Sequence, residues 1–221
     1  MKKIIKSKEP KEWTEYRLTP GVKYSPISEL REALLKEQGY LCAYCMRRIP
    51  TKDGNSEETS RIEHLKSRKN HPDLQLDYSN MVICCPGAIG DGINFHCDKL
   101  KGENDVSFNL FDDHFISTIS YSSKDGCISS SNEIFNKEMN EILNLNHPLL
   151  MKNRLYTLKG VIEGLQREMS KKVAIAEKKE WKTAVIARLL THWKSKDAQG
   201  AYAPYCGMVE WFLNKKLQRK K

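Results

Sequence analysis

The chain has 221 residues, which is enough for one or two domains with a buried core. Hydrophobic residues make up 39% and charged residues 29%, which excludes a disordered chain, and no apolar run approaches the roughly 18 residues of a membrane helix. The formal net charge of +9 favours polyanionic partners such as nucleic acids, although a basic solvated surface explains it equally well. The N-terminus lacks an apolar signal-peptide core, so we expect a cytoplasmic location.

The first part of the chain alternates short ordered segments with polar turns. Residues 1–27 carry many charges and three prolines, which predicts an extended arm with short turns. Residues 28–38 have the apolar spacing of a short helix, and Gly39 ends it. Residues 40–50 predict a cysteine knuckle between two short strands, and residues 51–60 predict a polar turn.

The middle of the chain predicts two short strands and one helical turn. Residues 61–65 predict a strand, and residues 77–85 predict a turn followed by a strand. The glycine-bearing stretch 86–94 lacks the Gly-Lys-Ser/Thr of a phosphate-binding loop, so we interpret it as an insertion. Residues 96–102 predict a tight turn or the start of a helix, and residues 103–131 are strand-like and serine-rich.

From Glu133 onward the pattern becomes helical. Apolar residues spaced by three and four predict one face of a helix, and a second helix through Trp181 and Leu189 follows. The residues of the first face are Leu155, Leu158, Ile162, Leu165 and Met169. Such a face indicates packing against other helices rather than a cofactor site. We expect this helical half to dock a partner or clamp a substrate, and the N-terminal arm is an equal candidate for docking.

Seven cysteines are many for a protein expected in a reducing compartment, and five of them fall between residues 42 and 97. Clustered thiols in such a compartment indicate a metal site before they indicate disulfides. Cys42 and Cys45 form a C-x-x-C pair, and zinc requires four ligands in a tetrahedral array. Either Cys84 or Cys85, together with Cys97, can supply the second pair.

Two other interpretations of the cysteines remain open. The C-x-x-C spacing also occurs in thioredoxin-like redox sites, although a redox motif does not need further thiols downstream. A single cysteine is most often a small buried apolar residue, and this suits Cys127 and Cys206. For four clustered thiols the zinc interpretation is the stronger one.

A motif in chain order lies between and around these cysteines. Residues 42–102 carry Cys42-Ala43-Tyr44-Cys45, Glu63-His64, Asn80, Cys85 and the run HCDKLKG, which begins at residue 96. This order resembles the HNH, or ββα-metal, nucleases, whose pattern is C-x-x-C, an acidic residue with His, a central Asn, then Cys and Cys-Asn/His-x-x-Lys. The five-residue step from Asn80 to Cys85 fits that pattern and favours Cys85 over Cys84 as a zinc ligand.

The wider frame resembles one branch of these nucleases. The segments EQGYLCAYCMRRI, IEH, YSN and HCDKLKG are similar to the HNH partner of Septu-type antiphage systems, including retron-associated ones. In those systems an SMC-like ATPase accompanies the nuclease. The resemblance therefore implies a defence effector, a DNA or RNA substrate and an SMC-like ATPase partner. Because no apolar run has the length of a membrane helix, we expect no membrane association.

The resemblance also implies a role for each residue of the motif. His64 would be the general base, because an imidazole titrates near neutral pH and accepts a proton from water. Glu63 and Asp98 would bind a catalytic divalent ion, Mg²⁺ or Mn²⁺, while the four thiolates hold a structural Zn²⁺. Asn80 would orient His64 or fix its loop. Lys101 would contact phosphate or remain a solvated lysine.

Two departures from the family pattern bear on the ion site. Glu63 stands where most relatives have Asp, and Asp98 stands where they have Asn or His. His96 is therefore an alternative ligand for the catalytic ion or for zinc. Because successive strand residues point to opposite faces, Glu63 and His64 cannot both face one water from a regular strand. The other four histidines have no partner at ligand spacing, and we assign them no chemistry.

We therefore expect an α+β protein with a small zinc-stabilised ββα-metal core and a mostly helical C-terminal domain. The expected division is an N-terminal arm and helix over 1–39, the HNH core over 40–112 and the helical domain over 113–221. The expected function is hydrolysis of nucleic-acid phosphodiester bonds by a metal-dependent endonuclease. The alternative is a non-catalytic zinc module that binds nucleic acid or protein.

Overall fold

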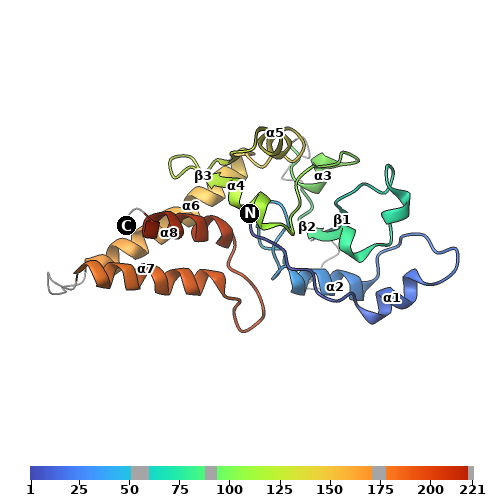
Figure 1. Ribbon diagram of the computed structural model, residues 1–221, viewed down its shortest axis with the longest axis horizontal. Coiled ribbons are helices and arrows are strands. Elements are labelled where there is room, and N and C mark those ends of the chain that lie inside the picture. The colour runs from blue at the N-terminus through green and yellow to red at the C-terminus, as the bar shows by residue number, and fades with distance from the viewer. Residues whose placement is uncertain (51–59, 88–93, 171–177, 219–221) are drawn as a thin grey trace.

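A computed structural model describes residues 1–50, 60–87, 94–170 and 178–218, and it is α+β, as expected (Figure 1). The α-helices are α1 (Lys11–Arg17), α2 (Ser28–Glu37), α3 (Asp98–Lys101), α4 (Asp113–Thr118), α5 (Glu133–Glu141), α6 (Pro148–Met169), α7 (Lys178–Lys194) and α8 (Cys206–Gln218). Short 3-10 helices cover Pro72–Leu74 and Tyr78–Asn80. The strands are β1 (Arg61–His64), β2 (Met81–Cys84), β3 (Ile119–Tyr121) and β4 (Ile128–Ser130).

Strands β1 and β2 form a small antiparallel sheet at the centre of the predicted core region. Their register pairs Arg61 with Cys84 at one end and His64 with Met81 at the other. Every residue of β2 is buried, and α2 packs against this strand. Helix α3 follows in the chain. The predicted strands at 61–65 and 77–85 and the predicted helical turn at 96–102 are confirmed.

The N-terminal arm is not uniformly extended, because it contains α1. The carbonyl of Pro10 accepts the first helical hydrogen bond from Thr14 N at 3.0 Å. Trp13 on this helix is fully buried, and its indole N–H donates to the carbonyl of Leu76 at 3.2 Å. A helix this short is stable only through tertiary packing, so its local sequence did not predict it.

Residues 103–131 also differ from the strand-like prediction. Helix α4 occupies their centre, and the Asp112 side chain caps it by accepting a hydrogen bond from His114 N at 2.9 Å. Strands β3 and β4 are only three residues long and pair antiparallel. The predicted polar turn at 51–60 and the glycine stretch at 86–94 lie largely outside the described residues.

The helical C-terminal part is confirmed. Helix α7 packs against both α6 and α8, and α8 also packs against β3 (Figure 1). On the predicted face of α6, Leu158 and Leu165 are buried, and Ile162 and Met169 pack partly buried against the core. Among the described helices, none has the length and apolar character to cross a membrane. The division into three units stays a prediction.

Candidate functional site

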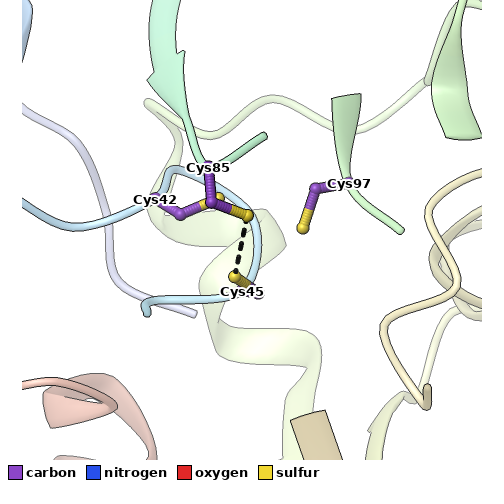
Figure 2. A group of neighbouring side chains, drawn as sticks. All are labelled: Cys42, Cys45, Cys85 and Cys97. Carbon is purple, nitrogen blue, oxygen red and sulfur yellow. Dashed lines mark hydrogen bonds between the residues drawn. The ribbon is translucent and has the colours of Figure 1, made fainter. Parts of the chain in front are cut away.

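Four thiols converge beside the β1–β2 sheet. Cys42 and Cys45 lie in the knuckle that follows α2, Cys85 follows β2, and Cys97 directly precedes α3 (Figure 2). Their sulfur atoms all lie within 4.8 Å of one another, and all four residues are buried. The knuckle is held to the sheet by the Ala43 N–H, which donates to the carbonyl of Ile83 at 3.0 Å.

The spacing of the sulfurs fits a zinc ion. Zinc–sulfur bonds of about 2.3 Å in a tetrahedron place neighbouring sulfurs about 3.8 Å apart. The Sγ atoms of Cys45 and Cys85 are 3.7 Å apart. Burial opposes ionisation of Cys42, but hydrogen bonds from neighbouring thiols outweigh it and hold the pKa of that thiol well below its usual value. Burial and the other thiols raise the pKa of Cys45 and Cys97, so a cation is needed to hold four thiolates together.

The structure groups Cys85, not Cys84, with the other three thiols. Cys84 is the last residue of β2 and Cys85 follows it, so the two side chains leave the backbone in different directions. Cys97 has a φ of 56°, which a non-glycine residue rarely adopts, and its N–H donates to the carbonyl of Leu143 at 2.8 Å. His96 is fully buried, with Nδ1 3.1 Å from the Cys97 sulfur, so it lies with the thiols.

A second cluster lies where β1 faces α3. The Lys101 ammonium lies 2.7 Å from Glu63 Oε1 and donates to the His64 carbonyl at 3.1 Å. The Tyr44 hydroxyl donates to the same Glu63 oxygen at 3.0 Å. Burial, and then a hydrogen bond shared with the Asp98 carboxyl, raise the pKa of Glu63 well above its usual value. Glu63 and Asp98 therefore form an adjacent carboxyl pair, of the oxygen-donor kind that would suit a divalent cation such as Mg²⁺.

Lys101 occupies neither of the environments that the sequence suggested. Its side chain is fully buried, so the solvated alternative is wrong, and its ammonium contacts Glu63 and the β1 backbone instead of presenting itself at the surface for phosphate. A buried lysine requires a paired carboxylate, and Glu63 provides it. Lys101 thus offsets part of the negative charge of the carboxyl pair.

His64 has a defined tautomer. Its Nε2 atom is 3.0 Å from the carbonyl of Gln75, and because a carbonyl can only accept, Nε2 carries the proton in the neutral ring. Nδ1 is then the free acceptor. Burial, with smaller contributions from the neighbouring cations Arg68 and Lys101, lowers the pKa of His64 to about 4, although the hydrogen bond to Gln75 opposes this shift. His64 is therefore a neutral base at physiological pH.

Asn80 acts on the loop that follows β1. Its side-chain oxygen accepts from Lys66 N at 2.8 Å, and its amide donates to the carbonyls of Lys66 and Leu74 at 3.0 and 3.2 Å. These bonds tie Lys66 to Leu74, the residue directly before Gln75, which is the hydrogen-bond partner of His64. Of the two predicted roles, the contacts correspond to fixing the loop.

Both Glu63 and His64 line one open cleft of about 580 Å³, together with Asp98. Neighbouring residues of a regular strand point to opposite faces, but this rule does not keep Glu63 and His64 apart here. His64 is the last residue of β1, and residues of the loop after it also line the cleft. The rim is basic: Arg31, Arg61, Arg68 and Lys69 line the cleft with the single further acid Glu103. His96 and Asn80 are outside the cleft lining.

Three residues of this site carried no signal in the sequence motif. Tyr44 lies inside the C-x-x-C pair, Gln75 accepts from the His64 ring, and Tyr24 packs against the same ring from the N-terminal arm. Each acts through a contact between segments far apart in the chain. The position of Tyr44 within the knuckle was the one available clue, since its ring emerges between two clustered cysteines.

No protein-family model matches the chain. It is 29% identical over 100 residues to a protein of Escherichia coli described as "Retron Ec83 putative HNH endonuclease". The match covers 40% of this chain and 36% of that protein, so the chain spans little more than a third of its relative's length. This distant similarity supports an HNH nuclease, and the buried four-cysteine cluster fits zinc binding.

Proposed function

We propose that the protein is an HNH endonuclease that hydrolyses nucleic-acid phosphodiester bonds with a divalent metal ion, on a ββα-metal core stabilised by Zn²⁺ at the four cysteines. The observation that carries the proposal is the convergence of a neutral imidazole and an adjacent carboxyl pair in one basic-rimmed cleft. His64 is the proposed base, and Glu63 and Asp98 are the proposed ion ligands. The similarity to a retron HNH endonuclease supports the same reaction class.

The side chains of the cleft suit hydrolysis in the following way. The Nδ1 atom of His64 takes a proton from a water molecule, whose oxygen then forms a bond to phosphorus. The ester P–O bond on the opposite side breaks, and the leaving oxygen takes a proton from solvent. The Gln75 carbonyl keeps the imidazole in the required tautomer and stabilises the imidazolium that forms.

Glu63 and Asp98 would hold Mg²⁺ or Mn²⁺, which supplies Lewis-acid stabilisation of charge on the phosphate and on the leaving oxygen. The two carboxyl groups have different environments. Glu63 is buried and already engaged by Tyr44 and Lys101, whereas Asp98 is paired with Arg61 at 3.4 Å on the cleft rim. Arg61 thus keeps Asp98 oriented toward the cleft from which the phosphate would enter.

The test is cleavage of plasmid DNA, single-stranded DNA and structured RNA by purified protein with Mg²⁺ or Mn²⁺. His64→Ala should lower the cleavage rate per zinc-loaded molecule by a factor of at least about 100, the usual contribution of a general base, while zinc content stays unchanged. His192→Ala is the matched control, because His192 is exposed on α7. Equal binding but no cleavage by any preparation, including complexes with its partner, would favour the non-catalytic zinc module.

We further propose that the nuclease is the effector of an antiphage system and is controlled by an SMC-like ATPase. The support is the Septu-like frame of the segments EQGYLCAYCMRRI, IEH, YSN and HCDKLKG, and the similarity to a protein described as a retron HNH endonuclease. Tagged chain should co-purify with an SMC-like ATPase encoded beside it, and a variant lacking residues 133–221 should lose the complex but keep zinc. Retention of the complex by that variant would move the docking site to the N-terminal arm.

A further inference from the structure

The N-terminal arm reaches the centre of the cleft through Tyr24. The Tyr24 and His64 rings are 4.5 Å apart between centroids and lie nearly perpendicular, at 85°. Tyr24 comes from the segment between α1 and α2, outside the residues of the nuclease motif. The ring of the proposed base is therefore packed on one side by a residue of the arm.

Tyr24 and His64 share a third residue. The side-chain oxygen of Gln75 accepts from the Tyr24 backbone N–H at 3.2 Å, and the backbone carbonyl of Gln75 accepts from His64 Nε2 at 3.0 Å. Trp13 adds an edge contact to Tyr24 at 6.1 Å, and its indole binds Leu76, the neighbour of Gln75. The arm and the β1–β2 connection thus fix the position of Tyr24 from two sides.

The Tyr24 ring also contacts a cation, Arg68. The guanidinium carbon of Arg68 lies 4.6 Å from the centroid of the Tyr24 ring, which is the distance of a cation–π contact. Arg68 is exposed and lines the cleft. His64, Tyr24 and Arg68 therefore form a continuous row of contacts that runs from the base to the cleft rim.

Arg68 differs from the other cations that line this cleft. Arg61 is paired with Asp98, Lys69 with Glu103, and Arg31 donates to the backbone and hydroxyl of Ser60. Within the residues that the structure describes, no carboxylate is paired with Arg68. A planar guanidinium that is fixed in direction but not neutralised is suited to binding phosphate oxygens.

We propose that Tyr24 is a positioning residue that sets both the His64 ring and the Arg68 guanidinium, and that Arg68 binds a backbone phosphate of the nucleic-acid substrate. The inference rests on the proposed nuclease function. It assigns the N-terminal arm a part in the active site, since removing the Tyr24 ring releases the base and the phosphate contact together.

Two sets of variants test the proposal. Cleavage kinetics compare Tyr24→Phe, which keeps the ring, with Tyr24→Leu, which removes it; Tyr156→Leu is the control, because Tyr156 is exposed on α6, outside the cleft lining. Tyr24→Leu should lower kcat about a hundredfold, the cost of a misplaced catalytic group, and Tyr24→Phe should restore it to within about twofold. A purely structural role would lower the melting temperature without changing kcat per zinc-loaded molecule.

Binding is measured separately in the His64→Ala background, with a DNA duplex and an RNA hairpin as probes. Arg68→Met should weaken binding about tenfold and reduce the slope of log affinity against log salt by about one, while Lys69→Met, already neutralised by Glu103, should change little. Because Tyr24 acts through Arg68, Tyr24→Leu combined with Arg68→Met should bind no more weakly than Arg68→Met alone.

The outcomes separate the two proposals. If the wild-type protein cuts nothing, the proposed function fails, and the binding comparison alone decides the roles of Tyr24 and Arg68. Binding and kcat values for Tyr24→Leu equal to those of Tyr24→Phe would overturn the positioning role. Unchanged affinity and salt dependence in Arg68→Met would overturn the phosphate contact, whatever the cleavage activity.

Discussion

Replacing Lys101 with methionine tests whether its ammonium stabilises the buried carboxyl pair of Glu63 and Asp98. The ammonium makes two contacts, one with Glu63 Oε1 at 2.7 Å and one with the His64 carbonyl at 3.1 Å. The side chains of Lys101 and Glu63 are almost fully buried, with exposed fractions of 0% and 6%. Methionine has a similar volume, so the change removes charge and donors rather than packing.

The expected loss is large for a single substitution. Breaking a buried ion pair by removing one partner costs about 3–5 kcal/mol, because the remaining charge is left uncompensated. We expect the lower end, about 3 kcal/mol, because Glu63 keeps the Tyr44 hydroxyl and can share a proton with Asp98. For a chain of this length that is a fall in melting temperature on the order of 10 °C.

The assay is urea unfolding of the zinc-loaded protein, with Lys99→Met as the matched control because Lys99 is exposed on the same helix. The control should change the free energy of unfolding by less than about 0.5 kcal/mol. Adding Glu63→Gln to Lys101→Met should recover part of the loss, since the uncompensated carboxylate is removed. Mg²⁺ should raise the stability of Lys101→Met more than that of the wild type, because the ion takes over neutralisation of Glu63.

A loss below about 1 kcal/mol would refute the reasoning, because it would mean that Lys101 and Glu63 are not a desolvated pair. A full loss that Glu63→Gln does not relieve would show that the ammonium acts mainly through the His64 carbonyl. Equal effects of Mg²⁺ on variant and wild type would argue against Glu63 as an ion ligand.

Three further predictions concern zinc, pH and the helical half. The purified protein should contain one zinc ion per chain by elemental analysis; Cys45→Ser should lose it and unfold, whereas Cys84→Ala should keep it, and zinc loss in Cys84→Ala would contradict the assigned ligand set. Because the folded pKa of His64, about 4, is below its unfolded value of about 6.5, its contribution to stability is fully present above pH 6.5 and is lost as pH falls from 6.5 to 4, by up to about 3 kcal/mol. The fall in unfolding free energy over that range should be smaller in His64→Ala. Arg154→Met should destabilise by about 3 kcal/mol in thermal unfolding, since the buried guanidinium donates to the carbonyls of Gly126 and Leu145 at 2.6 and 2.7 Å, and no measurable change would mean that water replaces these bonds.

Local pattern was enough for the β1–β2 strands, for two of the C-terminal helices and for the four-cysteine cluster. The C-x-x-C pair at Cys42 and Cys45 and the thiol of Cys97 indicated one cluster, and the structure brings their sulfurs together. The choice of Cys85 came from its step after Asn80, and the structure agrees. The three- and four-residue spacing of the C-terminal half predicted two helices, and α6 and α7 are present at those positions. Such features depend on neighbours in the chain, which the sequence lists directly.

Contacts between distant segments were decided only by the tertiary structure. Helix α1 depends on the burial of Trp13, and the fully buried state of Lys101 depends on a carboxylate supplied by β1. The surroundings of His64 come from Tyr24 in the arm and Gln75 in the loop. A chain sequence states which side chains carry charge or hydrogen-bonding groups, but desolvation and partner geometry set what those groups do, and both arise only when separate segments pack together.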